Sequence, residues 1–176
     1  PISEPDYFRV AKFNTENGIF SYNGYDRFAN AKKVYLPKGT TIDIHCPVNV
    51  TITDQYGRII ADNGTNEIPN ATMIIINDTK TFYLPSNLTY SVEITAYAAG
   101  TFNFTKISPI GNNISVIKFT NISITNSTIA SIEIEPNATN LSMSIDYDGD
   151  GNIDEEKEQD TKEMMIINQP PNANFT

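Results

Sequence analysis

The chain is built from short runs in which apolar and polar residues alternate, and turn residues separate these runs at close spacing. In the segment 49–53, for example, valine and isoleucine take every second position. A period of two places the apolar side chains on one face of a β-strand, whereas a helix requires a period near 3.6. Many short strands between turns are typical of a sandwich or a barrel. We therefore predict an all-β fold.

The choice of apolar residue supports the same prediction. The chain contains 25 Ile and only four Leu. β-Branched side chains pack well on pleated sheets, and Leu is the stronger helix former. An AT-rich genome would also favour Ile and Asn codons, so the alternation decides the fold class.

The alternating runs give a list of expected strands. They are 7–13, 18–22, 34–36, 41–46, 49–53, 59–60, 73–76, 80–84, 90–97, 101–107, 114–119, 122–124, 129–134 and 141–145. We expect a hairpin turn at 54–58 and a loop at 61–72. The segment 155–167 suits either a helix or a charged edge strand.

The triplet Asn-x-Ser/Thr, the acceptor for N-linked glycosylation, is strongly over-represented. Random placement of the chain's 21 Asn and 30 Ser plus Thr would give about four triplets. Twelve are present, at Asn49, Asn63, Asn70, Asn77, Asn87, Asn103, Asn113, Asn121, Asn126, Asn137, Asn140 and Asn174. Such acceptors function only on exported chains. We expect an extracellular glycoprotein; the alternative is that polar strands place Thr near Asn by accident.

Charge and cysteine content exclude several classes of protein. The net charge of −9 argues against binding to nucleic acid or to anionic membranes. No apolar run reaches the length of a membrane-spanning helix. Cys46 is the only cysteine, so an internal disulfide is excluded. Because the chain begins at Pro1, we expect a processed form or a piece of a longer protein.

The strongest local motif is an acidic, glycine-containing loop at 146–154. It places Asp146, Asp148, Asp150, Asn152 and Asp154 at alternate positions. Calcium takes six to eight oxygen ligands, and this spacing matches the start of a calcium-binding loop. Gly151 would permit the sharp turn, and Ile153 would anchor the loop on the core. We therefore predict calcium as a cofactor.

The loop departs from the usual pattern at its end. The twelfth position normally holds a bidentate glutamate, but this chain has Lys157 there. Glu156 or Glu158 would then close the coordination shell, and we favour Glu156. The alternative is an Asp- and Gly-rich hairpin that binds no ion.

The sequence contains few residues that could form a catalytic site. His45 is the only histidine, and it neighbours Cys46, so the two side chains would point to opposite faces of a strand. Glu133 and Glu135 share one face of a strand, where a solvated surface is the simpler interpretation. We expect no enzymatic activity.

Two stretches resemble known families. Residues 170–176 look like the first strand of a PKD (polycystic kidney disease-type) domain. The span from Cys46 to about Glu156 resembles β-sandwich accessory domains of secreted archaeal and bacterial multidomain proteins, with matching stretches at 47–58, 66–71, 84–85, 90–94, 100–105 and 146–154. The aspartate loop is similar to calcium loops of the thrombospondin type 3 and dockerin kinds.

These resemblances do not cover residues 1–45, which are β-rich by their own pattern; together with that pattern they give an organisation and a function. We expect a β-rich segment at 1–45, an immunoglobulin-like sandwich at 46–168 with its calcium loop at 146–156, and a linker with a PKD-like strand at 169–176. Two packed sandwich units are an alternative. The implied role is spacing, adhesion, or envelope or filament assembly, with neighbouring domains or identical subunits as partners. A carbohydrate- or lipid-binding module of a secreted hydrolase is the alternative function.

Overall fold

The computed structural model describes residues 12–14, 19–21, 34–35, 39–45, 47–111 and 113–166. Its first three segments, β1 (Lys12–Asn14), β2 (Ile19–Ser21) and β3 (Val34–Tyr35), pair in that order in a small antiparallel sheet. Cys46, the linker with its PKD-like strand at 169–176 and the acceptor Asn174 lie outside the described residues.

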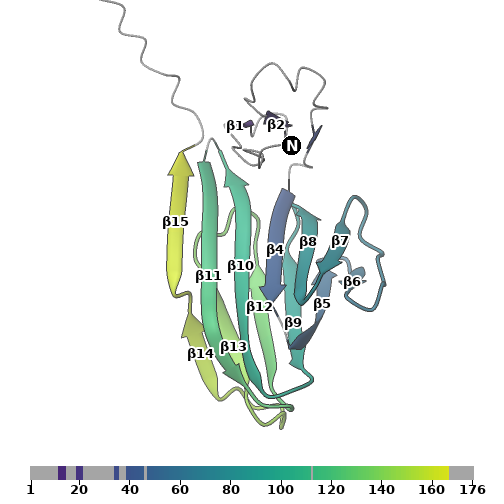
Figure 1. Ribbon diagram of the computed structural model, residues 1–176, viewed down its shortest axis with the longest axis vertical. Helices are drawn as coiled ribbons and strands as arrows, with labels where there is room; N and C mark the ends of the chain where they lie inside the picture. The colour runs from purple at the N-terminus through teal and green to yellow at the C-terminus, as the bar shows by residue number, and fades with distance from the viewer. Residues whose placement is uncertain are drawn as a thin grey trace, which may run out of the picture.

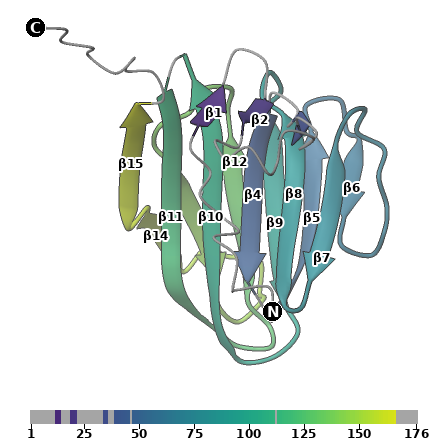
Figure 2. The same ribbon diagram turned by 45° about the horizontal axis from the view of Figure 1, so that its top comes forward.

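Two larger antiparallel sheets face each other and form a sandwich (Figures 1 and 2). The first sheet has the order β15-β11-β10-β4-β8-β7. Its strands are β4 (Gly39–His45), β7 (Thr72–Ile76), β8 (Thr79–Pro85), β10 (Gly100–Ile110), β11 (Asn113–Ile124) and β15 (Thr161–Ile166). The second sheet has the order β14-β13-β12-β9-β5-β6. Its strands are β5 (Val48–Asp54), β6 (Ile59–Ala61), β9 (Tyr90–Ala96), β12 (Ile129–Ile134), β13 (Ser142–Asp146) and β14 (Glu155–Glu158).

The predicted all-β sandwich is confirmed, and the alternation explains it. In β5, Val48, Val50 and Ile52 are buried, while Asn49 between them is exposed. The same pattern recurs in β8, β9 and β12. Each strand therefore turns one apolar face to the opposite sheet, as a period of two requires.

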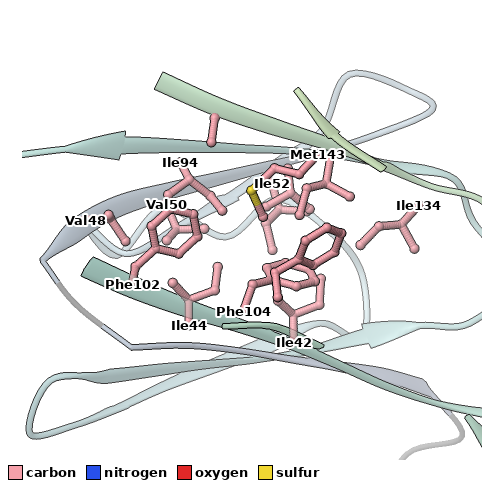
Figure 3. Close-up of a cluster of buried hydrophobic side chains, with 14 of the residues drawn as sticks. Ile42, Ile44, Val48, Val50, Ile52, Ile94, Phe102, Phe104, Ile134 and Met143 are labelled. Carbon is pink, nitrogen blue, oxygen red and sulfur yellow. The ribbon is translucent and has the colours of Figure 1, made fainter. Parts of the chain in front are cut away.

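The core lies between the two sheets (Figure 3). Side chains such as Ile42 and Phe104 from the first sheet meet Ile52 and Met143 from the second. Phe104 also packs edge-to-face against Phe119, with ring centroids 5.9 Å apart. This geometry aligns the positive edge of one ring with the negative face of the other and adds to the area that both rings bury.

The segment 155–167 contains no helix in its described part, so the helical alternative is wrong and the edge-strand alternative is right. β14 pairs with β13, and β15 pairs with β11, so the segment supplies an edge to each sheet. Its charged residues suit a helix surface and a strand edge equally well. Pairing with a sheet that is already formed decides between them, because tertiary context overrides weak propensity.

The sandwich includes a strand that the sequence analysis assigned to the N-terminal segment. β4 lies in the middle of the first sheet, between β10 and β8. Its residues Ile42 and Ile44 are fully buried in the core. The first sheet therefore begins at Gly39 rather than after residue 45.

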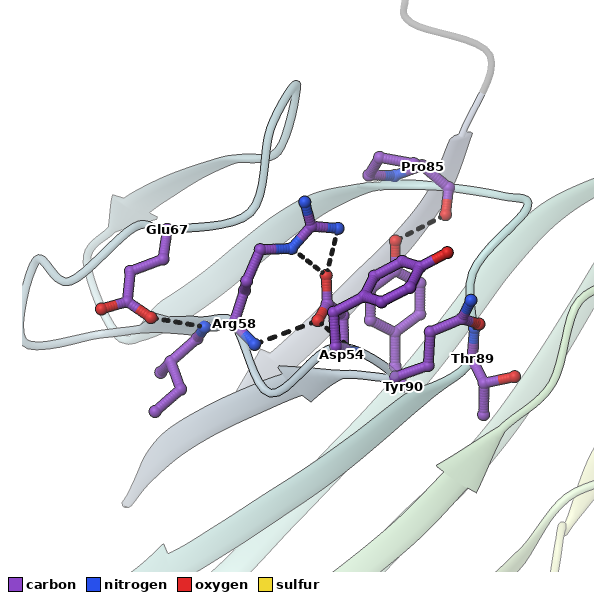
Figure 4. Close-up of polar contacts among 9 residues, drawn as sticks. Asp54, Arg58, Glu67, Pro85, Thr89 and Tyr90 are labelled. Atoms are coloured by element: carbon purple, nitrogen blue, oxygen red, sulfur yellow. Dashed lines mark hydrogen bonds and ion pairs between the residues drawn. The ribbon is translucent and has the colours of Figure 1, made fainter.

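A buried tyrosine fixes the connection from β8 in the first sheet to β9 in the second (Figure 4). Tyr90 opens β9, and its hydroxyl donates a hydrogen bond of 2.7 Å to the carbonyl oxygen of Pro85 at the end of β8. The tyrosine side chain therefore ties the two sheets together where the chain crosses between them.

The predicted turn at 54–58 is organised by one buried carboxylate (Figure 4). Oδ1 of Asp54 accepts hydrogen bonds from the backbone N–H groups of Tyr56 and Arg58. Its Oδ2 accepts the Arg58 side chain at 2.7 Å from Nε and 2.6 Å from the terminal nitrogen. Burial alone would raise the pKa of Asp54, but these hydrogen bonds and the charge of Arg58 lower it below the usual range.

Among the described residues, no helical segment has the length and hydropathy that crossing a bilayer would require.

Candidate metal centre

The predicted calcium loop connects β13 to β14 at one end of the second sheet. Asp146 is the last residue of β13 and is only 4% exposed, whereas the residues from Asp148 to Asp154 are exposed. Strand alternation does not explain this burial, because Ile145 beside it points into the core. The loop itself covers Asp146, since Gly149 and Gly151 donate their backbone N–H groups to its carboxylate. The first aspartate of the loop, Asp146, therefore anchors the loop to the sandwich.

The carboxylate of Asp146 shapes the loop. Oδ1 accepts the backbone N–H of Gly149 at 2.7 Å, and Oδ2 accepts that of Gly151 at 2.9 Å. Both glycines have positive φ, +77° and +89°, so the loop makes turns that other residues adopt only with strain. Burial would raise the pKa of Asp146, but the backbone hydrogen bonds outweigh it and lower that pKa.

A second loop holds this one in place. The hydroxyls of Thr125 and Thr128 both donate to the carbonyl oxygen of Tyr147, at 2.8 Å and 3.1 Å. A Cβ at Gly149 would lie 2.8 Å from the carbonyl oxygen of Ser127. The acidic loop thus packs closely on the β11–β12 connection, and a side chain at position 149 would force the two apart.

Three of the predicted ligands converge. Asp146, Asp148 and Asp154 each offer a carboxylate oxygen, and these oxygens all lie within 4.8 Å of one another. Calcium–oxygen distances are about 2.4 Å, so two ligands on opposite sides of one ion are about 4.8 Å apart. The aspartate trio, as we call these three residues, could therefore hold a divalent cation, and its oxygen ligands are the kind that calcium prefers.

The other two predicted carboxylate ligands, Asp150 and Glu156, are not part of the aspartate trio. The carboxylate of Asp150 accepts hydrogen bonds from the backbone and the side-chain amide of Asn152, at 2.8 Å and 2.9 Å. Glu156 lies on β14, where its carboxylate accepts hydrogen bonds from the hydroxyls of Ser144 and Ser142. Because Glu156 is the strand partner of Ser144, its side chain is held on the outer face of the sheet.

Ile153 does not anchor the loop, which corrects an expectation from the sequence. Its side chain is 53% exposed. Asp154 instead donates its backbone N–H to the carbonyl of Ile145, which brings the chain back to the β13 edge with Ile153 turned outward. Tyr147 is the residue that packs against the core from this loop.

Tyr147 is also a functional neighbour that the sequence analysis missed. Its hydroxyl donates a 2.6 Å hydrogen bond to Glu155, and its backbone N–H donates to Asp154 at 2.7 Å. The hydrogen bond to Glu155 and burial raise the pKa of Tyr147 to about 12. Tyr147 therefore positions one carboxylate of the trio through its backbone. An aromatic residue between two aspartates was the sequence feature that could have indicated this role.

The predicted glycosylation acceptors can be placed for all but Asn174. Nine of the other eleven asparagines are exposed, and Asn103 and Asn113 are half-buried. Four of the exposed ones, Asn70, Asn77, Asn121 and Asn137, are also the residues other than glycine with positive φ in the described part of the chain. Asn tolerates this conformation better than most residues, so local backbone geometry accounts for those four: Asn121 lies at an irregularity in the pairing of β10 with β11, and the other three lie in turns.

Comparison with known proteins adds no family. No family model, no curated protein and no solved structure matches this chain significantly. The geometry described above is therefore the basis for the functional interpretation.

Proposed function

We propose that this chain is a non-catalytic structural or adhesion domain of a glycosylated extracellular surface protein, stiffened by calcium and used for spacing or for envelope or filament assembly. The observation that carries the proposal is the surface position of the acceptors. All eleven described acceptor asparagines are exposed or half-buried, and none lies in the core. Carbohydrate can therefore be attached at these positions without disturbing the packing between the sheets.

The architecture supports a sandwich of the immunoglobulin-like kind. In such folds a tyrosine near the start of a strand bonds back to the backbone at the corner where the chain changes sheets. Tyr90 makes this contact with Pro85 between β8 and β9. Sandwiches of this kind serve widely as spacers in surface proteins, and a PKD-like domain after residue 169 would suit the same role.

Calcium would be held by Asp146, Asp148 and Asp154. An ion there would neutralise part of the repulsion among three close carboxylates in a chain of net charge −9. The loop lies next to β14, and β15 follows three residues after β14 ends. Because the loop packs on the connection between β11 and β12, calcium would stiffen that end of the sandwich, whereas the end of β15 pairs with Asn113 at the other end of β11.

The direct test of the glycoprotein proposal is the intact mass of the protein from its native source. We expect a native mass above that of the unmodified polypeptide, and loss of the excess after enzymatic removal of N-linked sugars. Peptide mapping would locate the sugars on the exposed asparagines. A native mass equal to that of the bare chain would refute the proposal of glycosylation.

A second candidate function, binding of a carbohydrate as a module of a secreted hydrolase, is favoured by one groove. It has a volume of about 410 Å³ on the outer face of the second sheet. Its polar lining residues include Ser91, Ser131, Glu133, Ser144 and Glu156. Hydroxyls and carboxylates in alternation along a sheet can hydrogen-bond a chain of sugar hydroxyls.

A pull-down on insoluble polysaccharides separates the two functions. Retention in high salt that falls with Glu133→Gln would support the binding module. Thr101→Ala, an exposed change on the first sheet, is the control and should leave retention unchanged. Absence of retention on every polysaccharide would leave the structural role.

A further inference from the structure

The edge strand β7 is apolar and exposed. It ends the first sheet beside β8 (Figures 1 and 2), and its sequence Thr72–Ile76 contains no charged residue. Ile74, Ile75 and Ile76 are 45%, 47% and 65% exposed. A flat apolar edge with unpaired backbone groups is a template for pairing with another strand, and natural proteins usually protect such edges.

The other three edges of the sandwich carry protection. The β6 edge is covered by the loop that follows it, because Glu67 accepts the N–H of Ile59 and Thr65 accepts that of Ala61. All four residues of β14 are charged. β15 carries Lys162 and Glu163. Among the four edges of the described sandwich, β7 alone has neither a covering loop hydrogen bond nor a charge.

The hairpin to β8 determines which backbone groups of β7 point outward. A two-residue turn, Asn77–Asp78, joins Ile76 to its partner Thr79. In a two-residue hairpin the closing pair exchanges both backbone hydrogen bonds, and every second pair does the same. Ile74 is therefore bonded to β8, while the N–H and C=O groups of Met73 and Ile75 face away from the sheet.

This spacing makes β7 complementary to itself. In an antiparallel arrangement, the outward groups of Met73 meet those of Ile75 in a second copy, and the reverse pair forms by symmetry. All four outward groups of each strand are then bonded, and Ile74 lies opposite Ile74 of the copy. The two-fold axis that relates the two copies is perpendicular to the sheet, so it does not exchange the two faces of the sheet. Met73 and Ile75 therefore lie on the core side in both copies.

We propose that β7 is an interaction surface for a second copy of this chain, and that the two β7 strands pair antiparallel about Ile74 to form a continuous twelve-stranded sheet. Charge favours this edge over the other surfaces of the sandwich for contact between two copies. The chain has a net charge of −9, so two copies repel each other over most of their surfaces, and the uncharged β7 is where they approach at least electrostatic cost.

Two glycosylation acceptors lie at the ends of this surface. Asn70 precedes β7 by two residues, and Asn77 follows its last residue; both are exposed. A sugar at either position would occupy the space that a second copy needs. This blocking effect of sugars rests on the proposed glycosylation, whereas the self-pairing of the bare chain does not. Carbohydrate at Asn70 or Asn77 would therefore keep the protein monomeric.

The first experiment measures the mass in solution of the bare chain, produced without glycosylation. We expect a dimer of twice 19.6 kDa that dissociates on dilution. Ile74→Lys should give a monomer that melts at the temperature of the diluted, dissociated parent, because this side chain is already exposed in the single chain. Ile129→Lys, a similarly exposed isoleucine on β12, is the control and should remain dimeric. A bare chain that stays monomeric at its solubility limit would overturn the proposal.

A disulfide test distinguishes this pairing from other contacts. In a Cys46→Ala background, Ile74→Cys should form a linked dimer on mild oxidation, because the two α-carbons would be about 4.5 Å apart. Ile76→Cys is the matched control: its distance to the same residue in the copy would be about 14 Å, too long for a disulfide. Equal crosslinking of the Ile74→Cys and Ile76→Cys variants would contradict the proposal. A dimer in which Ile74→Cys stays unlinked, as it would if β7 paired with β15 of the copy, would also contradict it.

The blocking effect of sugars at Asn70 and Asn77 is tested separately on native protein. If sugars are present at Asn70 or Asn77, we expect a monomer that dimerises after their removal or in the Asn70→Gln/Asn77→Gln variant. A glycosylated protein that dimerises as strongly as the bare chain would refute the blocking effect of sugars but not the pairing of β7.

Discussion

The hydroxyl of Tyr90 donates a 2.7 Å hydrogen bond to the carbonyl oxygen of Pro85, and this bond closes the corner where the chain passes from one sheet to the other. The Tyr90 side chain is almost wholly buried. Burial and the nearby charge of Asp54 raise the pKa of Tyr90, so its hydroxyl stays protonated and remains a donor.

Replacing Tyr90 with phenylalanine should destabilise the fold. The change keeps the ring but leaves the Pro85 carbonyl without its partner, and we expect a loss of about 1–3 kcal/mol in the free energy of unfolding. Urea denaturation of the two proteins measures this difference. Tyr56→Phe, at a tyrosine that is two-thirds exposed, is the control and should change stability little. Equal stabilities for Tyr90→Phe and the parent would show that the corner bond contributes nothing.

Asp54 should make stability depend on acid pH. Its folded pKa lies below the unfolded value of about 3.9, so its contribution is complete above pH 4 and is lost as the pH falls through the folded pKa. Asp54→Asn should therefore flatten the loss of stability between about pH 5 and pH 2. Urea midpoints across that range give the slope. An identical slope for both proteins would assign the acid sensitivity to other carboxylates.

Lys106 should make stability depend on alkaline pH in the opposite sense to most lysines. Its side chain is 1% exposed, and its Nζ donates to the carbonyl of Ala138 at 2.7 Å. Burial lowers the pKa of Lys106 from 10.5 to about 8. Between these values the unfolded chain holds a proton that the folded chain lacks, so stability rises with pH.

Lys106→Met tests this expectation. The variant should lack the rise in unfolding free energy that the parent shows from about pH 8 to pH 9.5. Lys118→Met, at a more exposed lysine on β11, should retain the rise. A parent whose stability is flat or falls over this range would contradict the lowered pKa.

Alternation along the sequence predicted most of the sandwich because burial enforces it. The strand predicted at 49–53 is β5 with one extra residue at each end, and the turn at 54–58 is present. The same periodicity held a signal for Lys106, which continues the every-second-residue series of Phe102 and Phe104. Its charge argued for the surface, but its position on the strand decided its burial.

Other features depended on contacts between distant residues. Glu156 follows the aspartates closely in sequence, but pairing with Ser144 holds it on the outer face of the sheet. Ile153 is apolar, yet the return of the chain to β13 turns it outward. Ser108 and Ser115 are strand partners with buried hydroxyls that have no hydrogen-bond partner among the described residues, and no local pattern indicated this.

Calcium dependence of thermal stability tests the central claim, a calcium-stiffened scaffold, most directly. We expect EDTA to lower the melting temperature of the parent and excess Ca²⁺ to restore it, because an ion that binds only the folded state stabilises it. Asp148→Asn/Asp154→Asn should abolish this response. Asp150→Asn removes a charge from the same loop outside the aspartate trio and should retain most of the response. Identical melting temperatures for the parent in EDTA and in Ca²⁺ would contradict the account.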